Sequence, residues 1–399
     1  MKYLSRSYIE NQTVIYRPEL SVPVSSQGEV MDDFRIRASL PTLRYLLAGH
    51  CKVVVVSKIG RPKNPNPALS MKPVAKRLAE LLQLPFLEAP SSVYPGRHVV
   101  FLSDDVALPG LPEKIAALKE SVIVLENIRF YPEEQESSEI FAAALARLGD
   151  VYVGDSFGVA HRTDTSVSVL PMYLPHFAGL LMESEIRNLN IVLNSPRPPF
   201  LLMMGGGKIS EKTGIIERLG RTATTIAVGG GIANVFFAAL GYEVGKSLVE
   251  LEGIETAKHM LKEFKSKLLL PTDVAVLADS GTPATRAAYQ VLPGDTILDI
   301  GPQTILRLSG VIKKARTIVW NGPLGMCERK PFQTGTMAVA KVVGGVGKRT
   351  CFTVVGGGET VEAVRQAGQE NHIDHLSTGG GAMLEYLSGK VLPGIKALE

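Results

Sequence analysis

The sequence contains few cysteines and no long apolar run. Its three cysteines, Cys51, Cys327 and Cys351, lie far apart and form no CxxC pair, which argues against a zinc ribbon or a disulfide framework and favours reduced, buried thiols. No stretch approaches the roughly 18 apolar residues of a membrane span, and the first residues lack the apolar segment of a secretory signal. These absences predict a cytoplasmic protein that does not associate with a membrane.

Charge and catalytic motifs exclude further classes. A formal net charge of +4 over 399 residues is too small and too scattered to predict a nucleic-acid binder. The seven histidines form no HExxH pair and no GxSxG motif occurs, so zinc and serine hydrolases are disfavoured. His161 beside Arg162 could contact a ligand or be a structural histidine. The segment 241–247 resembles a Walker A loop, but it has three residues between its glycines where that motif needs four. We therefore expect Gly241 to end a helix over 233–240.

The pattern that is present is an alternation of short apolar runs and helical stretches. At this length two domains are expected, and the alternation predicts an α/β fold with two doubly wound parallel sheets. Helical spacing occurs at 68–82, 140–148, 256–264 and 360–367, and a helix over 183–193 precedes a proline-rich stretch that we take as the domain boundary. The expected strands span residues 52–57, 98–103, 121–126, 150–154, 199–204, 225–228, 273–278, 317–321 and 352–355.

Four arginines flank the expected strand ends of the first half: Arg35, Arg61, Arg129 and Arg162. In open α/β sheets, ligands bind outside the carboxyl ends of the strands. Guanidinium groups bind carboxylates and phosphates through paired hydrogen bonds. Any one of the four could be an ordinary surface residue, but together they predict a site for a small dianion.

Glycine-rich loops follow strands in the second half. The segment Gly205-Gly-Gly-Lys208 is expected to open a helix over 209–212, with Lys208 and Lys212 one turn apart on one face, and to hold a triphosphate. The segment Gly356-Gly-Gly-Glu-Thr360 also joins a strand to a helix, where an anion and a metal ion could bind. Turn formation for the glycines and helix capping for Glu359 remain the alternatives.

The motifs, taken in order, resemble those of the phosphoglycerate kinases, and they extend over nearly the whole chain. They read GRP, LENIRF, DSFGVAHR, GGGKIS, GGGIAN, GYEVGKSL, DIGPQT, WNGPLG, VGGGET and STGGGA. The resemblance implies an N-terminal domain for the acidic substrate over 1–182, an interdomain helix and linker over 183–198, and a Mg-nucleotide domain over 199–385. Residues 386–399 would return to the N-terminal domain. It further implies hinges near 194–199 and 377–379, and a cytoplasmic monomer whose partners are small molecules rather than nucleic acid or membrane.

The resemblance also implies roles for individual residues. Lys208 and Arg35, with the helix start at Gly358, would stabilise the transferring group, Glu328 would bond the ribose, and Glu359 would bind Mg²⁺ that accompanies ATP or ADP. The acid would be held by Glu19, Ser21, Arg35, Lys58, Arg61, Arg129 and Arg162. The nucleotide would be held by Gly206, Gly207, Lys208, Lys212, Gly230, Asn321, Glu328, Gly357, Gly358, Glu359 and Thr360.

Several positions depart from the family pattern. Glu19, Ser21 and Lys58 stand where the family has aspartate, asparagine and histidine, and we expect Lys58 to pair with Glu19. Gly154 replaces an asparagine, while Glu211 and Glu359 replace aspartates. Because magnesium requires oxygens at about 2.0–2.1 Å, Glu359 is expected to change the affinity for the metal.

Three functions follow from these observations. The first is reversible in-line transfer of a phosphoryl group from ATP to 3-phosphoglycerate, which gives ADP and 1,3-bisphosphoglycerate. This reaction belongs to glycolysis and gluconeogenesis. The second is a kinase of the same mechanism that acts on another phosphorylated carboxylate. The third is a nucleotide- or metabolite-binding protein that has lost catalysis. Retention of Arg35, Lys208 and Lys212 favours an enzyme.

Overall fold

The computed structural model describes residues 1–62, 64–88, 96–106, 108–118, 121–348 and 350–399. The chain forms two compact units: unit 1 comprises Met1–Ile186 with Val391–Glu399, and unit 2 comprises Arg187–Lys390. The chain leaves unit 1 within helix α6 (Leu180–Asn194) and returns after Lys390. Among the described residues, no helix is both long enough and apolar enough to cross a bilayer.

Unit 1 is built on a seven-stranded sheet in the order β3-β4-β5-β2-β1-β6-β7. All of its strand pairs are parallel, and its interior strands are rich in buried apolar residues, as expected for a sheet covered on both faces. The strands are β1 (Thr13–Pro18), β2 (Lys52–Val55), β3 (Phe86–Leu87), β4 (Val99–Leu102), β5 (Val122–Leu125), β6 (Val151–Asp155) and β7 (His176–Ala178).

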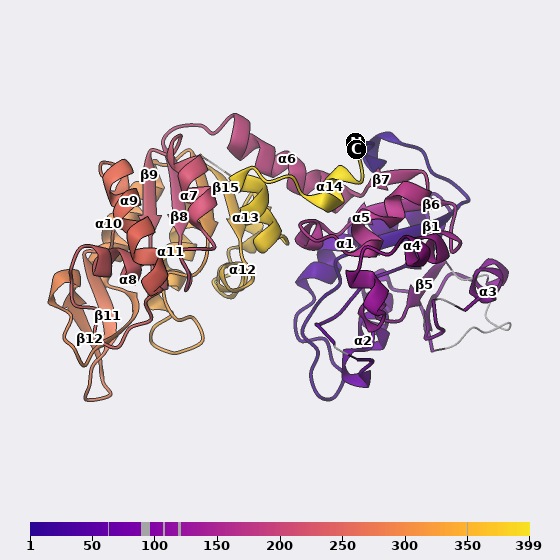
Figure 1. Ribbon diagram of the computed structural model, residues 1–399, viewed down its shortest axis with the longest axis horizontal. Coiled ribbons are helices and arrows are strands. Elements are labelled where there is room, and N and C mark those ends of the chain that lie inside the picture. The colour runs from indigo at the N-terminus through magenta and orange to yellow at the C-terminus, as the bar shows by residue number, and fades with distance from the viewer. Residues whose placement is uncertain (63, 89–95, 107, 119–120, 349) are drawn as a thin grey trace. The chain divides into compact units, whose positions relative to one another are not determined.

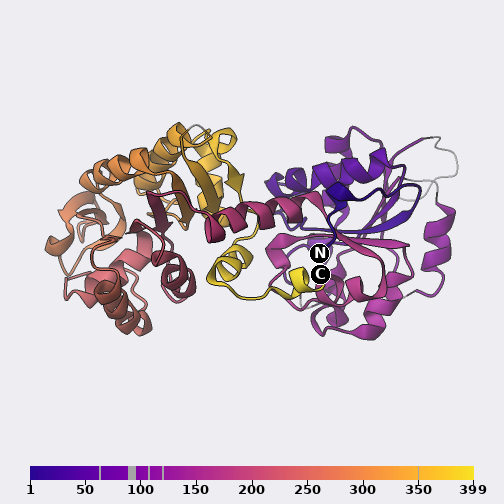
Figure 2. The same ribbon diagram turned by 90° about the horizontal axis from the view of Figure 1, so that it is seen from above.

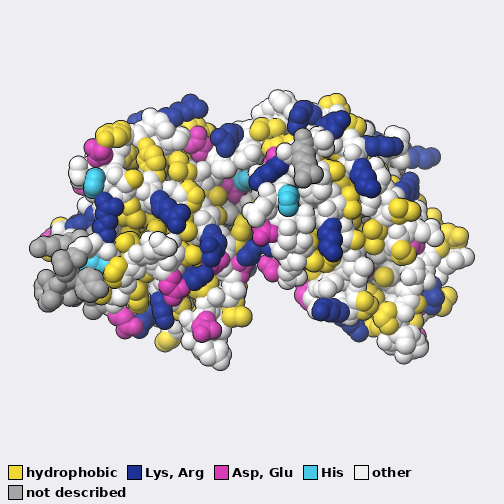
Figure 3. Space-filling model, turned by 180° about the vertical axis from the view of Figure 1, so that it is seen from behind, with side chains coloured by type: hydrophobic (Ala, Val, Ile, Leu, Met, Phe, Trp, Pro, Cys, Tyr) yellow, Lys and Arg dark blue, Asp and Glu magenta, His cyan; other side chains and the backbone are white. Residues whose placement is uncertain are grey.

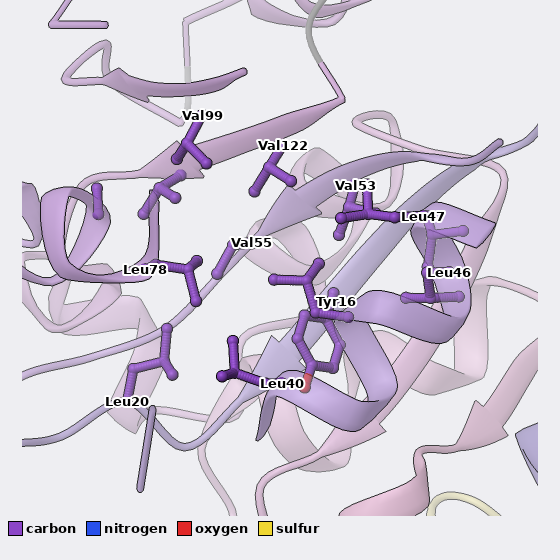
Figure 4. Packing of buried hydrophobic residues seen from close by; sticks show 14 of the residues in the cluster. Tyr16, Leu20, Leu40, Leu46, Leu47, Val53, Val55, Leu78, Val99 and Val122 are labelled. Carbon is purple, nitrogen blue, oxygen red and sulfur yellow. The ribbon is translucent and has the colours of Figure 1, made fainter. Parts of the chain in front are cut away.

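Helices line both sides of this sheet (Figures 1 and 2). Figure 4 shows part of the core, in which Tyr16 of β1 lies beside Leu40 of α1 (Phe34–Ala48) and the valines of β2 face the same interior.

The C-terminal segment is part of the same unit. In this segment, the backbone N–H of Gly394 donates to the carbonyl of Ala160 over 2.8 Å. The helices are α1 (Phe34–Ala48), α2 (Lys72–Leu82), α3 (Leu111–Ala117), α4 (Glu139–Ala146), α5 (Thr165–Ser168) and α14 (Pro393–Lys396).

Unit 2 contains a six-stranded parallel sheet in the order β10-β9-β8-β14-β15-β16. Its strands are β8 (Phe200–Met204), β9 (Thr225–Val228), β10 (Leu268–Leu269), β14 (Thr317–Asn321), β15 (Phe352–Gly356) and β16 (His375–Leu376). Its helices after α6 are α7 (Thr213–Gly220), α8 (Gly230–Ala239), α9 (Ile254–Glu263), α10 (Pro302–Lys314), α11 (Thr334–Val346), α12 (Gly358–Gln366) and α13 (Gly381–Ser388).

Each sheet has a point where the strand order reverses. In unit 2 the chain runs outward from β8 to β9 and β10, and then restarts on the other side of β8 with β14. In unit 1 the corresponding neighbours are β1 and β6. Loops that leave adjacent strands in opposite directions open a crevice at the carboxyl edge. The two expected doubly wound parallel sheets are therefore confirmed. In each sheet, the carboxyl edge at the reversal of strand order is where a ligand is expected to bind.

Strand β11 corrects one expectation. The run at 273–278 was expected to be a buried parallel strand, but β11 (Asp273–Leu277) is the middle of an antiparallel three-stranded sheet with β12 (Pro283–Ala287) and β13 (Thr296–Ile300). Its side chains alternate between buried and half-buried positions near its end. That alternation is typical of an antiparallel strand with one covered face, and a short apolar run does not reveal it.

Helix α7 corrects a second expectation. It begins at Thr213 rather than at Ile209, so Lys208 and Lys212 do not share a helical face. The residues before it form a turn in which the N–H groups of Lys212 and Thr213 both donate to the carbonyl of Ile209 over 2.9 Å. Ser210 holds this turn through hydrogen bonds to the carboxylate of Glu250, a tertiary contact that local spacing cannot predict.

The expected strands also omit β1, an interior strand of the unit 1 sheet that lies between β2 and β6. Its apolar run is short and is interrupted by Arg17, which is fully buried. The guanidinium of Arg17 donates to Ser166 Oγ over 2.7 Å and to the carbonyl of Pro18 over 2.8 Å. These hydrogen bonds, one of them to the sequence-distant Ser166, make a buried charge tolerable within a core strand.

Surface charge is mixed. On the face drawn in Figure 3, lysine and arginine side chains are scattered among uncharged ones on both units. This agrees with the small net charge of +4.

Candidate functional site

The first cluster of candidate residues lies in unit 1, just beyond the ends of β1 and β2. Lys58 Nζ lies 3.3 Å from Glu19 Oε1, and Arg35 Nη1 lies 3.7 Å from the same oxygen. Arg35 also donates to the carbonyl of Ser21 over 2.8 Å. Glu19, Ser21, Lys58 and Arg35 are thus brought together, and the expected Lys58–Glu19 pair is confirmed.

This cluster is buried, which determines its electrostatics. The Glu19 side chain is 2% exposed and that of Lys58 is 11% exposed. Burial lowers the pKa of the Lys58 ammonium, and the neighbouring Glu19 carboxylate opposes that shift. Glu19 Oε2 is buried without a hydrogen-bond partner among the described residues, so this oxygen can accept a bond from a ligand.

The second cluster is a cationic pocket in the same unit. Its volume is about 440 Å³, and its charged lining consists of Arg61, Arg129 and Arg162. Arg61 is exposed, whereas Arg129 is 4% exposed. Three guanidinium groups around one hollow favour a multiply charged anion such as a phosphate.

Neighbouring charged groups act on two of these arginines. Arg129 Nη2 lies 2.7 Å from Asp164 Oδ2, which directs the remaining guanidinium donors elsewhere. Burial, followed by repulsion from Arg129, lowers the pKa of Arg162. The buried Nε atoms of both arginines have no hydrogen-bond partner within the described ranges. An anion that accepts these bonds would relieve both the repulsion and the missing contacts.

In unit 2, Lys212 and Asn321 form a pair at the reversal of strand order. Asn321 ends β14 beside Met204, which ends β8, and its Oδ1 accepts a hydrogen bond from Lys212 Nζ over 2.7 Å. Burial lowers the pKa of Lys212, while Glu211 and Glu359 raise it. Asn321 Nδ2 is buried and lacks a partner in the described part of the chain. Together they offer an ammonium and a free amide donor to an anion.

The loops around this pair approach each other closely. A Cβ on Gly322 would lie 2.1 Å from the carbonyl oxygen of Gly205, so only glycine allows this contact. The hydroxyl of Thr360 accepts a hydrogen bond from the N–H of Gly322 over 2.9 Å. Thr360 therefore positions the loop after β14, and its oxygen already has a donor.

Helix α12 begins at Gly358, with Gly357 at its N-cap at φ +93°, as expected from the glycine run. The first N–H groups of a helix have no partner inside it and attract anions. Glu359 lies exposed in this first turn. Lys208 is also exposed, in the loop between β8 and α7.

A pocket of about 280 Å³ adjoins these loops, and its wall combines glycine backbone with apolar side chains. Of the expected nucleotide residues, Gly206, Gly207, Gly230, Glu328 and Glu359 line it. Such a pocket, largely apolar with a few polar groups, is typical of a small-molecule site.

Residues 4–390 match the model of the family described as phosphoglycerate kinase. The chain belongs to the phosphoglycerate kinase family. It is 44% identical over 393 residues to the phosphoglycerate kinase of Chloroflexus aurantiacus (strain ATCC 29366 / DSM 635 / J-10-fl), covering 96% of this chain and 95% of that protein. It is 41% identical over 401 residues to that of Pelotomaculum thermopropionicum, covering 98% and 97%.

Solved structures of phosphoglycerate kinases share the fold. The structure from Pyrococcus horikoshii OT3 superposes with a TM-score of 0.86 at 32% identity, covering 100% of this chain and 98% of that one. The structure from Coxiella burnetii gives a TM-score of 0.82 at 33% identity, covering 99% and 98%.

Mg²⁺ is expected from the sequence to bind together with the nucleotide, and the side chains near the pocket are compatible with that expectation. The described residues contain no group of three or more His, Cys, Asp or Glu side chains that could hold a metal ion. Magnesium commonly binds through one or two carboxylates together with phosphate oxygens and water. The exposed carboxylate of Glu359 beside the pocket is compatible with that mode.

Two polar pocket residues of this family member were not among the sequence candidates. Asn234 and Asp299 line the pocket and are 2% and 3% exposed. Asn234 is a lone amide within the apolar run IANVFFAA, and Asp299 directly precedes the IGP motif. An isolated polar residue within an apolar run is the signal that could have identified Asn234.

Proposed function

We propose that this protein catalyses reversible transfer of a phosphoryl group between ATP and the carboxylate of 3-phosphoglycerate, as in glycolysis and gluconeogenesis. The observation that carries the proposal is that this family member has two separate sites for anionic ligands, one in each unit. Unit 1 has an arginine-lined pocket, and unit 2 has a glycine-lined pocket beside a lysine and a helix start. We further propose that it acts as a cytoplasmic monomer on small molecules alone.

We assign the acid to unit 1. Arg61, Arg129 and Arg162 bind the phosphate of phosphoglycerate, because three guanidinium groups can surround its oxygens. Arg35 lies beside Glu19 and Ser21 and faces the carboxylate end. Glu19 Oε2 accepts a hydrogen bond from the substrate hydroxyl, and Lys58 neutralises the buried carboxylate.

We assign the nucleotide to unit 2. Lys212 and Asn321 donate to phosphate oxygens, and the N–H groups at Gly357 and Gly358 face the terminal phosphates. Glu328 on the pocket rim accepts from the ribose. The base enters the pocket between Gly206, Gly207 and Gly230.

The chemical step is a direct in-line displacement. A carboxylate oxygen of the acid attacks the γ-phosphorus, a new O–P bond forms, and the bond to the β,γ-bridging oxygen breaks to release ADP. Lys208, Arg35 and the start of α12 stabilise the charge on the transferring group, which is the main requirement of such a reaction. Glu359 would hold the Mg²⁺ that accompanies the nucleotide, and the ion would neutralise part of the phosphate charge.

A coupled assay tests the proposal. Purified protein with Mg-ATP and 3-phosphoglycerate should release ADP, and Lys208→Met should lower kcat by roughly 10²–10³-fold. Lys246→Met is the matched control, because Lys246 is an exposed lysine of the same unit paired with Asp279; its kcat should match the wild type. Absence of turnover in folded, ATP-binding protein would overturn the proposed acceptor and call for a screen of other acids.

A further inference from the structure

Asp164 is a buried acidic residue next to the arginine pocket of unit 1, and the proposed function gives it no role. Its side chain is 7% exposed, and its Oδ2 lies 2.7 Å from Nη2 of Arg129. Arg129 lines the pocket together with Arg61 and Arg162, whereas Asp164 is not among the lining residues. A carboxylate beside a site for anions repels the ligand, so its presence there requires an explanation.

Helix capping does not account for this carboxylate. Asp164 occupies the N-cap of α5, where an aspartate side chain usually accepts a hydrogen bond from an N–H group of the first turn. Among the described residues, no N–H group of the helix donates to this side chain. Its carboxylate is therefore available to act on the arginines.

The backbone around Asp164 is held in place from both sides. On one side, Ser137 Oγ donates to the carbonyl of Thr163 over 2.7 Å. On the other side, the N–H and the hydroxyl of Ser166 donate to the buried carboxylate of Glu134 over 2.9 and 2.6 Å. Because these bonds do not involve the arginines of the pocket, we expect Asp164 to keep its position when an anion enters.

Two other buried carboxylates of unit 1 have cationic partners outside the pocket lining. Glu134 lies 3.8 Å from Arg17, and Glu19 lies 3.3 Å from Lys58. Asp164 is paired instead with one of the three arginines that line the pocket, so three positive charges minus one negative charge leave two. A phosphate monoester carries a charge of about −1.5 to −2 at pH 7. The net charge of the pocket therefore matches one phosphate group.

The same carboxylate also acts on Arg162. Burial, followed by repulsion from Arg129, lowers the pKa of Arg162, and Asp164 opposes that shift. Asp164 thus stabilises the charged forms of two arginines that repel each other when no ligand is bound. Once an anion has bound, the carboxylate repels it, and this repulsion grows with the charge of the anion.

We infer that Asp164 determines the charge selectivity of the arginine pocket, because it cancels one of three positive charges and weakens binding most for anions more highly charged than a single phosphate. The inference rests on the proposed function and adds a residue that sets specificity on the side of the acid. Asp164 acts through its charge and through Arg129.

Sulfate and pyrophosphate test the inference, because both are small anions and pyrophosphate carries the higher charge. Each is titrated calorimetrically into full-length protein saturated with ADP, which occupies the site in unit 2. Asp164→Asn keeps the shape of the side chain and an oxygen that can accept from Arg129, but it removes the charge. This variant should bind sulfate about 10-fold and pyrophosphate about 30-fold more tightly than wild type, because the repulsion that it loses scales with the charge of the anion.

A gain no larger for pyrophosphate than for sulfate would overturn the inference. Weaker binding of both anions would overturn it as well, because the carboxylate would then serve to orient Arg129. A measurement on wild type alone does not depend on how the variant folds. In wild type, pyrophosphate should bind less than about 10-fold more tightly than sulfate, and a larger preference would contradict the charge match.

Asp104→Asn is the matched control. Asp104 forms an ion pair with Lys114 over 2.7 Å in the same unit and does not line the pocket, so this variant should keep the wild-type affinities for both anions. The coupled assay with phosphoglycerate separates the two proposals. Turnover without a charge-graded gain in Asp164→Asn would sink this inference alone, whereas a charge-graded gain without turnover would sink the proposed acceptor alone.

Discussion

The pair formed by Glu19 and Lys58 replaces, at the residue scale, the aspartate and histidine of the usual family pattern. The pair lies 3.3 Å apart and is almost fully buried. A longer carboxylate and a permanently cationic partner thus compensate each other, because either change alone would leave an unbalanced charge away from water.

Removal of one partner should therefore be costly. Lys58→Met should lower the free energy of unfolding by about 3 kcal/mol, at the lower end for a broken buried pair because Arg35 still lies 3.7 Å from Glu19. Urea unfolding measures this change. The double variant with Glu19→Gln should recover most of the loss, and additive effects of the two substitutions would show that the residues are not coupled.

The side-chain length of Glu359 is expected to affect the affinity for Mg²⁺. It lies in the first turn of α12 and lines the nucleotide pocket, but it carries one methylene more than the aspartate usual in the family. Glu359→Asp should tighten Mg-ADP binding, because a shorter carboxylate suits the rigid octahedron of magnesium. Calorimetry with and without Mg²⁺ measures the effect.

The control for this prediction is ADP without metal. Its affinity should change little in Glu359→Asp, since the substitution keeps the charge at the helix start. Weaker Mg-ADP binding in the variant would mean that the longer side chain is the better ligand here.

How far individual residues could be predicted depends on where their partners come from. The candidate arginines and glycines were found from their positions after strands, and the Lys58–Glu19 pair from charge balance. Asn234 and Asp299 were missed, because their burial beside the pocket results from α8 and β13 packing around it. The full burial of Arg17 was likewise hidden, since its partners Ser166 and Glu134 lie more than 100 residues away.

At the scale of secondary-structure elements, the side chain of Asp299 links the end of β13 to the start of α11 through hydrogen bonds. Its Oδ1 accepts from the N–H of Ile300 over 2.8 Å, and its Oδ2 accepts from the N–H of Gly335 over 2.7 Å. Burial raises the pKa of Asp299 to about 7, despite these two bonds. The folded protein therefore keeps a proton on this carboxyl that the unfolded chain releases.

The sign of the pH effect follows from that difference. Between the pKa of 3.8 that is ordinary for an aspartic acid and the raised pKa of about 7, the folded state binds more protons, so this group's contribution to stability falls as pH rises. Asp299→Asn cannot titrate and should gain stability relative to wild type between pH 5 and pH 8, by roughly 2–3 kcal/mol. Urea unfolding at both values measures it.

A surface carboxylate of the same unit is the control. Lys246 lowers the pKa of Asp279, which is exposed, so Asp279→Asn should show no gain over this pH range. A constant difference between wild type and Asp299→Asn at both pH values would contradict the assignment of the titration to Asp299.

Secondary structure followed from sequence where local rules are sufficient. The longer parallel strands after β1 and the helix that follows the glycine run at 356–358 were predicted, since apolar runs and glycine runs are local signals. The short parallel strands β3, β7, β10 and β16, of two or three residues each, were not. The antiparallel pairing of β11 and the delayed start of α7 were not, because they depend on β12, β13 and Glu250. Strand direction and helix starts are partly tertiary properties.

At the scale of the whole molecule, each unit has its own sheet, its own core and its own reversal of strand order. The arginine pocket consists of residues of unit 1 alone, and the glycine-lined pocket of residues of unit 2 alone. We therefore propose that the acid and the nucleotide bind independently when each is present by itself.

Reciprocal variants test this independence. Arg162→Ala should weaken binding of 3-phosphoglycerate by about 10–100-fold, the cost of one charge-assisted contact of roughly 1.5–3 kcal/mol, and leave the affinity for ADP unchanged. Lys212→Met should weaken ADP by a similar factor and leave the acid unaffected. Calorimetry with each ligand alone gives all four values. A loss of ADP affinity in Arg162→Ala would mean that the nucleotide depends on unit 1, and the assignment of one ligand to each unit would then be wrong.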